Sequence, residues 1–397
     1  MSVVFQEGVL SDIARVTMGQ SPKKEFVSST QEGLPLLNGP TEFGSSHPTP
    51  VQWSTSFSKT AEPGDILFCV RGSTTGRMNW ADQQYAIGRG IASISAINPQ
   101  ERHFVRAAID LVLPELLAAA TGSTFPNVSR LQLSELPVAL PSAAVRTEIS
   151  GLLGALDDKI ESNLRVRNLC RDLGGNLVAD TVRSAPSTQL EHYAASISRG
   201  VTPRYYKDED ASPVLVLNQK CIRDGWVTPE LARLMIPRSR EKSQAIARLD
   251  DLLVNSTGQG TLGRVARWDS DDPIYVDSHV TVVKADPRRI YPVLMPYLVF
   301  PLQDEIEHMA TGSTGQTELS PSRLAQLNVP LLSLEEQRPL SARLVALEAQ
   351  AHYCQVQSLK LTELRDALLP ELMSGRMRVD EAGRLVSEAL DEEVADV

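Results

Sequence analysis

The strongest constraint in this sequence is an internal repeat. The pentapeptide ATGST at residues 120–124 returns at 310–314, a shift of 190 in a chain of 397 residues. Long-period self-similarity identifies an architecture before any local pattern does. Two copies are too few for a solenoid, so the sequence predicts one chain with internal pseudo-twofold symmetry, an arrangement suited to a target with two parts. Other landmarks recur in the same order with shifts between 181 and 191: GQSP at 19–22 as GVTP at 200–203, DILF at 65–68 as DLLV at 251–254, GR at 76–77 and 263–264, and AL at 155–156 and 346–347.

Composition limits the class of protein. The length allows two or three domains, each large enough to bury a core, and 42% hydrophobic with 22% charged residues is typical of a globular protein. No apolar run approaches the ~20 residues that cross a bilayer, and the N-terminal residues do not resemble a signal peptide. The four cysteines are scattered and form no CxxC pair. We therefore expect a cytoplasmic protein with reduced thiols, no metal site and no membrane contact.

The net charge of −10 is unevenly distributed. Residues 379–397 carry seven acidic side chains and one arginine, so −6 of that charge lies in the last segment. Such a segment is typical of a solvated, flexible tail. The remaining body carries only −4, so local basic patches can exist on it. Charge neither supports nor excludes a nucleic-acid partner.

The first part of each copy favours an α+β fold. Short apolar runs rich in β-branched residues, separated by Gly, Pro, Ser and Thr, predict strands. The predicted strands are residues 65–70, 91–97, 214–217, 252–255 and 279–283. Helices are predicted at 104–120 and at 291–310, where Pro296 and Pro301 should break the second one.

The second part of each copy predicts a long helix. Residues 142–182 contain no proline, and leucines recur at helical spacing there and again over 334–369. Ser333 and Glu336 form a capping box. A helix of about 36 residues would be ~54 Å long, and its apolar stripe needs a partner. We expect the two helices to form an antiparallel coiled-coil pair; the alternative is that each packs on its own domain. The predicted helix-pair and partner contacts are Ile149, Leu152, Leu156, Ile160, Leu340, Leu344, Leu347, Leu361 and Leu364.

The sequence motifs that suggest an enzyme are weak. The run GQGTLG at 258–263 has the G-x-G-x-x-G pattern of a dinucleotide site, but such a site needs a helix to begin there. The following residues predict a turn and another strand instead. No Walker A sequence, nuclease motif, nucleophile elbow or metal-ligand spacing is found. We therefore expect no catalytic residues and no bound cofactor.

Polar loops that follow apolar strands recur in both copies. A single such loop is typical of a solvated turn, but loops repeated in both copies indicate a functional surface. Hydroxyl, amide and guanidinium groups at loop tips can bind phosphates and base edges. The candidate DNA-binding residues are Gln20, Ser21, Lys23, Lys24, Arg71, Ser73, Thr74, Arg77, Ser123, Thr124, Thr202, Arg204, Tyr205, Lys207, Ser256, Thr257, Gln259, Arg264, Ser313 and Thr314.

These residues carry a resemblance to a known family. The order GQSP at 19–22, PGDIL at 63–67 and TGST at 121–124 with NVSR at 127–130 resembles a target-recognition domain of type I restriction-modification specificity subunits. Residues 140–161, running into the first long helix, are similar to the central conserved helix of that family. In the second copy, residues 254–266, VDSHV at 276–280 and EQR at 336–338 also resemble family sequences. The likeness covers nearly the whole chain.

The resemblance implies two tandem target-recognition domains and a subunit without catalytic activity. Each domain would read one half of a split, asymmetric sequence in double-stranded DNA, while the paired helices set the spacing. Two modification subunits would dock on the helices and methylate adenine; restriction subunits would join them. S-adenosylmethionine, ATP and Mg would bind those partners. The alternative is a protein-interaction scaffold with duplicated domains. The expected divisions are recognition domains at 1–141 and 186–332, conserved helices at 142–185 and 333–378, and the acidic tail at 379–397.

Overall fold

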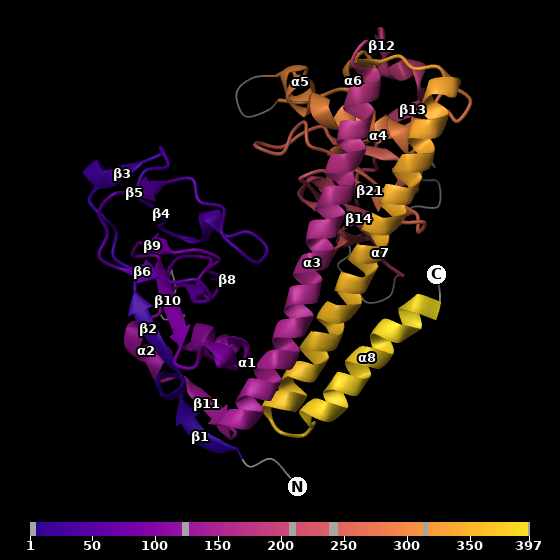
Figure 1. Ribbon diagram of the computed structural model, residues 1–397. Helices are drawn as coiled ribbons and strands as arrows, with labels where there is room; N and C mark the ends of the chain where they lie inside the picture. The colour runs from indigo at the N-terminus through magenta and orange to yellow at the C-terminus, as the bar shows by residue number, and fades with distance from the viewer. Residues whose placement is uncertain (1–4, 121–126, 206–211, 238–244, 313–316, 396–397) are drawn as a thin grey trace. The chain divides into compact units, whose positions relative to one another are not determined.

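The computed structural model describes residues 5–120, 127–205, 212–237, 245–312 and 317–395. The chain forms two compact units (Figure 1). Unit 1 comprises Met1–Asn163 and Val356–Val397, and unit 2 comprises Leu164–Gln355. Each unit therefore contains one mixed domain, made of the elements before a long helix, and half of each long helix. No helix in the described part of the chain is both long and apolar enough to cross a bilayer.

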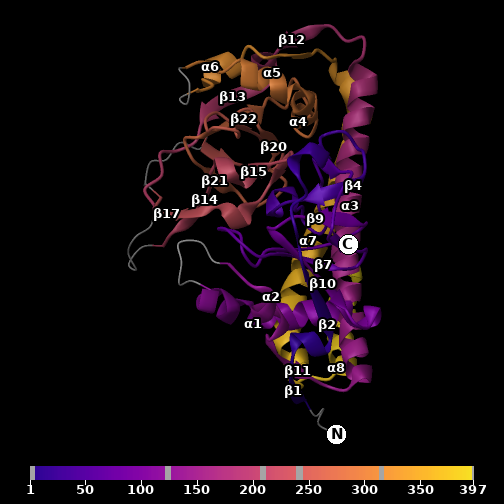
Figure 2. The ribbon, with the colours of Figure 1, turned by 90° about the vertical axis from the view of Figure 1, so that its left-hand side faces the viewer.

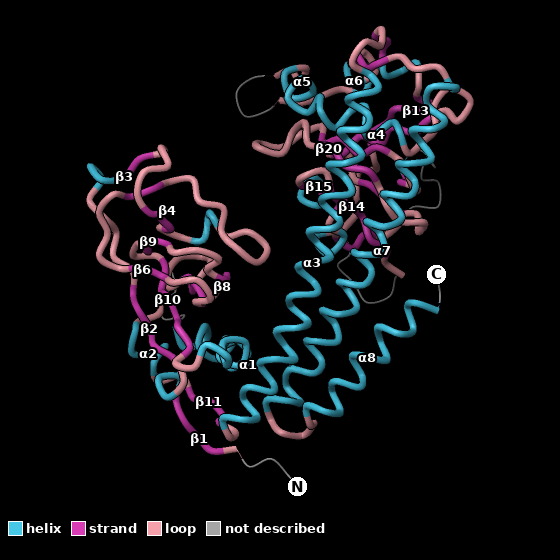
Figure 3. The backbone as a smooth tube through the Cα atoms, in the orientation of Figure 1, coloured by secondary structure: helices cyan, strands magenta, loops and turns pink. Residues whose placement is uncertain are grey.

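Mixed domain 1 of unit 1 combines β-sheets with helices (Figure 3). One sheet has the order β2-β10-β7-β8 and another has the order β3-β5-β4-β9-β6, while β1 pairs with β11. The strands are β1 (Gln6–Val9), β2 (Ala14–Met18), β3 (Val27–Ser28), β4 (Leu34–Leu37), β5 (Trp53–Ser54), β6 (Thr60–Ala61), β7 (Ile66–Cys69), β8 (Met78–Trp80), β9 (Tyr85–Ile87), β10 (Ile91–Ala96) and β11 (Pro137–Leu140). The helices are α1 (Arg102–Ala120) and α2 (Arg130–Ser134).

Mixed domain 2 of unit 2 repeats this topology. The sheet β13-β22-β19-β20 corresponds to β2-β10-β7-β8, and the pair β12–β23 corresponds to β1–β11. The strands are β12 (Ser187–Gln189), β13 (Ala194–Arg199), β14 (Val214–Leu217), β15 (Ile222–Arg223), β16 (Trp226–Val227), β17 (Arg233–Met235), β18 (Ile246–Ala247), β19 (Leu252–Asn255), β20 (Val265–Arg267), β21 (Ile274–Val276), β22 (Val280–Ala285) and β23 (Asn328–Pro330). The helices are α4 (Leu294–Val299), α5 (Gln303–His308) and α6 (Pro321–Leu324). The repeat seen in the sequence is thus a repeat of fold.

The central strand of each main sheet explains the apolar runs in the sequence. In β7, Ile66 and Phe68 pack into the core beneath α1, whereas Leu67 and Cys69 pack into a second core on the opposite face. In β19, Leu252 and Leu253 divide between two cores in the same way. A strand that is buried on both faces is apolar at every position instead of alternating. The predicted strands and the α+β class are therefore confirmed, and Pro301 does separate α4 from α5, whereas Pro296 lies inside α4 and does not break it.

The two long helices, α3 (Ala143–Val182) and α7 (Leu334–Met373), lie side by side in both views (Figures 1 and 2). In unit 1, Asn163 donates a hydrogen bond to Gln357 at 2.9 Å, and Arg365 pairs with Asp157 at 2.8 Å. Residue numbers fall along α7 as they rise along α3, so the helices run antiparallel, as predicted.

The apolar stripe of these helices serves both the helix pair and the mixed domains. In unit 1, Ile149 of α3 and Leu368 of α7 share one core with strands and α1. In unit 2, Val178 of α3 shares a core with Leu340 and Leu344 of α7 and with α4. Both alternatives raised by the sequence therefore apply: the helices pack on each other, and each also packs on a mixed domain. Of the predicted contacts, Ile149, Leu156, Leu340, Leu344 and Leu361 are buried, and Leu152, Ile160, Leu347 and Leu364 are half-buried.

The C-terminal segment corrects one expectation. The described residues form a helix, α8 (Val379–Ala395), where the sequence predicted a flexible tail. Asp380, Glu381 and Glu388 of this helix are exposed, and its apolar side packs on the core of unit 1. Ala382 is fully buried there, with Val379 and Val386 partly buried beside it. The net charge of the segment does not reveal these apolar residues. They are three and four residues apart, between acidic residues, and so lie on one face of a helix.

Removing residues 379–397 is expected to lower the stability of unit 1 by about 2 kcal/mol, because one buried alanine and two half-buried valines lose their contacts. The corresponding fall in melting temperature is about 5 °C, measured by circular dichroism or calorimetry. A chain ending at Leu390 keeps the packed residues and serves as the control. If the chain that lacks residues 379–397 melts at the same temperature as the full chain, the packing role of α8 is contradicted.

Candidate nucleic-acid interface

In unit 1 several strands end at the same edge of the mixed domain. β10 begins where β2 and β7 end, because Met18 pairs with Ala92 and Cys69 with Ile91. β4 and β9 are parallel, so their carboxyl ends also coincide. Backbone hydrogen bonds join the loops that follow: Gln20 N donates to Ile87 O at 2.9 Å and Val70 N to Gly90 O at 2.9 Å. We call this edge strand-end surface 1.

Strand-end surface 1 carries a connected set of polar side chains. Ser21 Oγ donates to Asn38 Oδ1 at 3.4 Å and accepts from the backbone N–H of Arg89 at 3.2 Å. Gln20 is exposed and accepts from Ser58 Oγ at 3.1 Å. Gln20 and Ser21 were predicted site residues, and the structure adds Asn38 and Arg89, which the sequence analysis did not select. Asn38 ends an apolar stretch that recurs in the second copy, which is the signal that could have identified it.

The loop after β7 supplies exposed groups at the same edge. Arg71, Ser73 and Thr74 are exposed, and the backbone of Arg71 pairs with Asn127. Arg77, another predicted residue, is exposed and also makes contacts within the domain. Its guanidinium donates to Phe43 O at 2.7 Å and to Pro40 O at 3.2 Å, so it supports the neighbouring loop. The predicted residues Lys23 and Lys24 are both exposed on the loop after β2, where Lys23 lies 3.8 Å from Glu25.

In unit 2 the equivalent strands end together in the same way. Val201 N donates to Val276 O at 2.8 Å, Asp277 N to Leu217 O at 2.9 Å, and Ser256 N to His279 O at 2.9 Å. These bonds join the loops after β13, β14, β19 and β21, which form strand-end surface 2. The recurring Gly19 and Gly200 are explained by this arrangement, because a Cβ at Gly200 would lie 2.0 Å from Val276 O and one at Gly19 would lie 2.2 Å from Gly88 O. Only glycine lets the two backbones approach so closely.

Strand-end surface 2 has its own polar cluster. Thr257 Oγ1 lies 2.7 Å from His279 Nδ1 and donates to Gln219 Oε1 at 3.3 Å. Thr257 was predicted, whereas Gln219 and His279 were missed because they come from other loops. Ser256 is a correction: it is fully buried, and its hydroxyl bonds to Thr281 at 2.6 Å. It therefore supports the sheet and cannot contact a ligand at the surface.

Other predicted residues of unit 2 lie at the loop tips. Gln259 is exposed in the glycine-rich loop, and Thr202, Arg204 and Tyr205 are exposed after β13. The guanidinium of Arg233 lies 5.1 Å from the centre of the Tyr205 ring. The glycine-rich loop leads into β20 and not into a helix, as expected from the sequence, so no helix N-terminus is available there for a pyrophosphate. Five predicted residues, Ser123, Thr124, Lys207, Ser313 and Thr314, lie outside the described residues.

Each of the two surfaces carries exposed cations. Lys24, Arg71 and Arg89 are exposed on surface 1, as are Arg204 and Lys220 on surface 2, although the net charge is −10. Asp277 is buried beneath surface 2, and burial raises its pKa while the hydrogen bond from the His279 N–H opposes that shift. Exposed cations beside amide and hydroxyl groups are the combination that binds phosphates and base edges. No cluster of three or more potential metal ligands is present among the described side chains.

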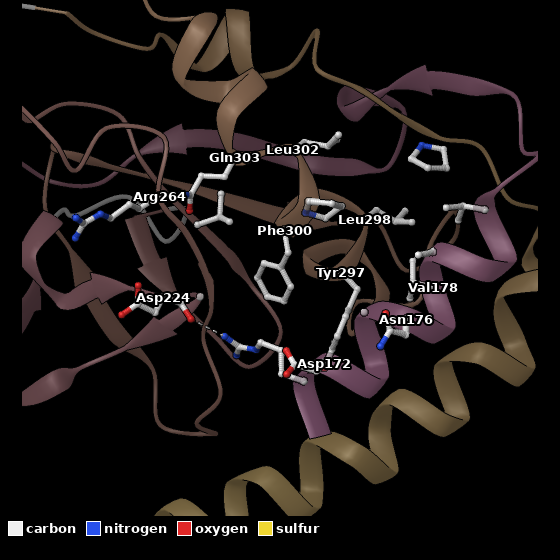
Figure 4. Close-up of a pocket in the computed structure, with 18 residues that line it drawn as sticks. Asp172, Asn176, Val178, Asp224, Arg264, Tyr297, Leu298, Phe300, Leu302 and Gln303 are labelled. Atoms are coloured by element: carbon white, nitrogen blue, oxygen red, sulfur yellow. Dashed lines mark hydrogen bonds between the residues drawn. The ribbon is translucent and has the colours of Figure 1, made fainter. Parts of the chain in front are cut away.

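A cavity of about 920 Å³ opens in unit 2 beside α3. Figure 4 shows Tyr297 beside the α3 residues Asp172 and Asn176, with Phe300 also among the lining residues. Arg264, a predicted DNA-binding residue, lines this cavity. Arg171 lines it as well; its guanidinium carbon lies 3.2 Å from the centre of the Trp226 ring. Burial lowers the pKa of Arg171 to about 10, so this guanidinium stays protonated at neutral pH.

Comparisons with known proteins agree with this geometry. Residues 3–168 match the family model of the type I restriction modification DNA specificity domain. The chain is 31% identical over 148 residues to the specificity subunit proposed for the type I restriction enzyme MjaX of Methanocaldococcus jannaschii; the match covers 37% of this chain and 35% of that protein. The matched part therefore spans about a third of the length of that curated relative.

The fold extends the likeness beyond the matched sequence. The crystal structure of a type I restriction-modification system S subunit from M. genitalium superposes with a TM-score of 0.57 at 16% identity, covering 93% of this chain and 96% of that one. At this identity the superposition shows a shared fold. Residues 3–168 thus resemble the type I restriction modification DNA specificity domain, and the fold of the chain is similar to that of the M. genitalium S subunit.

Proposed function

We propose that this chain is the DNA-reading, non-catalytic subunit of a cytoplasmic type I restriction-modification complex. Each mixed domain binds one half of a bipartite, asymmetric target in double-stranded DNA through its strand-end surface. The observation that carries this proposal is the recurrence of the same edge in both units, with Asn38 and Arg89 in one and Gln219 and His279 in the other. The same scaffold thus presents different hydrogen-bonding groups, which would read different bases.

The paired helices provide the surface for the partner subunits. Leu169 and Leu173 of α3 are 59% and 50% exposed, and Val345 of α7 is 56% exposed, all within unit 2. Exposed leucines one helical turn apart are typical of a protein contact. Two modification subunits docked on α3 and α7 would bring S-adenosylmethionine and methylate adenine, and restriction subunits would bring ATP-driven translocation with Mg. In this proposal the chain itself positions the partners on DNA.

Methylome sequencing tests the proposal most directly. A strain that carries this gene and its modification partner should show methylated adenines in one split motif, and deletion of this gene should abolish that methylation. The purified complex should also retain DNA that contains the motif. A complex that assembles fully yet leaves no split motif methylated would indicate a protein scaffold and would refute DNA reading.

Replacing Arg71 by alanine is expected to weaken DNA binding by the assembled complex without changing the motif, because an exposed arginine at a loop tip binds phosphate more often than bases. If Arg71 neutralises one phosphate, the plot of log K against log salt is less steep for the variant, and its negative slope shrinks in magnitude by about 0.9. Fluorescence anisotropy at several salt concentrations measures this slope. Arg384→Ala on α8 is the matched control, and equal slopes for both variants would place Arg71 outside the interface.

A further inference from the structure

Two helix carboxylates occupy equivalent places in the two units. Asp157 on α3 and Glu348 on α7 are separated by 191 residues, the same shift that relates the two long helices in the sequence. Glu348 is 4% exposed and Asp157 is half-buried. Both carboxylates lie where a mixed domain meets the helices of its own unit. We call them the anchor carboxylates.

In unit 2 the anchor carboxylate binds two side chains of the mixed domain. Arg267 at the end of β20 lies 2.8 Å from one oxygen of Glu348, and the hydroxyl of Tyr297 on α4 donates to the other at 2.6 Å. Burial and the nearby Glu348 raise the pKa of the Tyr297 hydroxyl, so it remains a donor. The ring itself rests on Gly174 of α3, where a Cβ would approach it within 2.6 Å. Mixed domain 2 is thus bonded to α7 through Glu348 and packs on α3 at Gly174.

In unit 1 the arrangement is similar, but only one of the two partners of the carboxylate belongs to the mixed domain, because Arg365 lies on the other long helix. Arg365 of α7 pairs with Asp157 at 2.8 Å, and Nδ1 of His103 on α1 lies 3.4 Å from the same carboxylate. His103 Nε2 accepts a hydrogen bond from Arg102 Nε at 3.1 Å, which leaves Nδ1 facing Asp157. The ring rests on Gly154 of α3, 2.9 Å from the position of a Cβ. In each unit a domain ring therefore sits on a glycine of α3 beside a helix carboxylate.

The energetics indicate that these contacts define geometry more than they add stability. A buried ion pair is often no more stabilising than an apolar pair of similar volume, because desolvation offsets the attraction. Removing Arg267 or Glu348, however, leaves the other charge buried and unpaired, so mixed domain 2 has one strongly preferred orientation on its helices. Burial acts to raise the pKa of Asp157, but the contacts with His103 and Arg365 outweigh it and hold the pKa below its usual value. This anchor therefore stays ionised at neutral pH.

We propose that Asp157 and Glu348 are positioning residues that hold each mixed domain at one angle on the helix pair and thereby limit the complex to a single gap between half-sites. The inference rests on the proposed DNA-reading function. One base pair more or less moves a half-site by about 3.4 Å and turns it by about 35°. In unit 2, contacts of 2.6 and 2.8 Å hold the domain to Glu348, and in unit 1 His103 lies 3.4 Å from Asp157; in both units the ring also packs closely on a glycine, so a displacement of that size is resisted.

Isosteric amides test the proposal in the assembled complex. Glu348→Gln keeps the shape but presents an amide N–H to Arg267 or Tyr297, and Asp157→Asn does the same in unit 1. We expect modification of targets whose gap is one base pair too long or too short to rise about tenfold relative to the cognate target, with the half-site letters unchanged. In the free protein, amide exchange in α4 should accelerate for Glu348→Gln. Asp158→Asn and Glu363→Gln, both exposed neighbours on the same helices, are the controls.

The outcomes separate this inference from the proposed function. If the folded variants select the gap as strictly as the controls, or if the letters change while the gap stays fixed, the anchor role is refuted. If the unaltered complex methylates no split motif, the DNA-reading proposal itself fails. Should Glu348→Gln not fold, Tyr297→Phe removes one bond to the carboxylate but keeps the ring on Gly174, and it should relax the gap to a smaller extent. Unaltered gap selection and unaltered α4 exchange in a folded Tyr297→Phe complex would then overturn the proposal.

Discussion

Exchanging residues 1–141 for the corresponding domain of another specificity subunit changes every letter of one half-site and leaves the other half-site as it was. This result is expected because strand-end surface 1 is built entirely from loops of mixed domain 1, which are joined by backbone hydrogen bonds to one another. The effect is all or none: methylation of the original motif falls to background, and a hybrid motif appears in methylome sequencing.

The exchange has a structural requirement that the sequence did not reveal. Mixed domain 1 shares its core with Ile149 of α3 and with Leu368 and Leu372 of α7. A donor domain must therefore bring apolar residues that fit these positions, or the hybrid will be unstable. The reciprocal exchange of residues 186–332 serves as the control and should change only the other half-site. An exchange of either domain that altered both halves would show that the two domains do not read independently.

Lengthening both long helices by a heptad is expected to change the gap and not the letters. The insertions follow Asn163 in α3 and Gln355 in α7, so that each unit keeps its own contacts, including the bond from Asn163 to Gln357. Seven residues add about 10 Å of helix, which corresponds to about three base pairs at 3.4 Å each. Methylome sequencing of the altered complex should therefore reveal the same half-sites separated by a longer gap.

The same insertion should also slow modification. Three base pairs turn the duplex by about 105°, whereas a heptad turns a helix by only ~20° relative to its starting face. The rotation of the duplex then no longer matches that of the helices, so at least one half-site is misaligned with its domain. Single-turnover methylation rates are therefore expected to fall. Insertion into α3 alone is the matched control and should destabilise the protein, because the two antiparallel helices no longer match in length. A new set of letters with an unchanged gap would refute the spacing role of the helices.

Much of the fold could be deduced from the sequence because its signals are local or repeat along the chain. The leucines at helical spacing predicted α3 and α7 and most of their buried positions, such as Ile149 and Leu344. The apolar run at 252–255 predicted β19, since a strand buried on both faces is apolar throughout. The shift of about 190 residues predicted that one topology is used twice, which the strand orders confirm.

The site could be predicted only in part. Gln20, Ser21 and Thr257 were found because each stands in a polar loop directly after an apolar stretch, a signal contained in a few neighbouring residues. Asn38, Arg89, Gln219 and His279 join them only because parallel and antiparallel strands bring four distant loops to one edge. Loop composition also could not tell Ser256, whose hydroxyl faces the sheet, from its exposed neighbours.

The contacts between each mixed domain and the long helices could be learned only from the tertiary structure. Asp157 and Glu348 can be aligned in the sequence, but their partners come from different elements: an α7 arginine and an α1 histidine in one case, a β20 arginine and an α4 tyrosine in the other. The acidic C-terminal segment became a packed helix for a similar reason, since Ala382 finds a core contributed by residues far away in the chain. Periodicity is a property of neighbouring residues, whereas burial and charge pairing depend on contacts between segments that are distant in sequence, and those contacts exist only once the chain has folded.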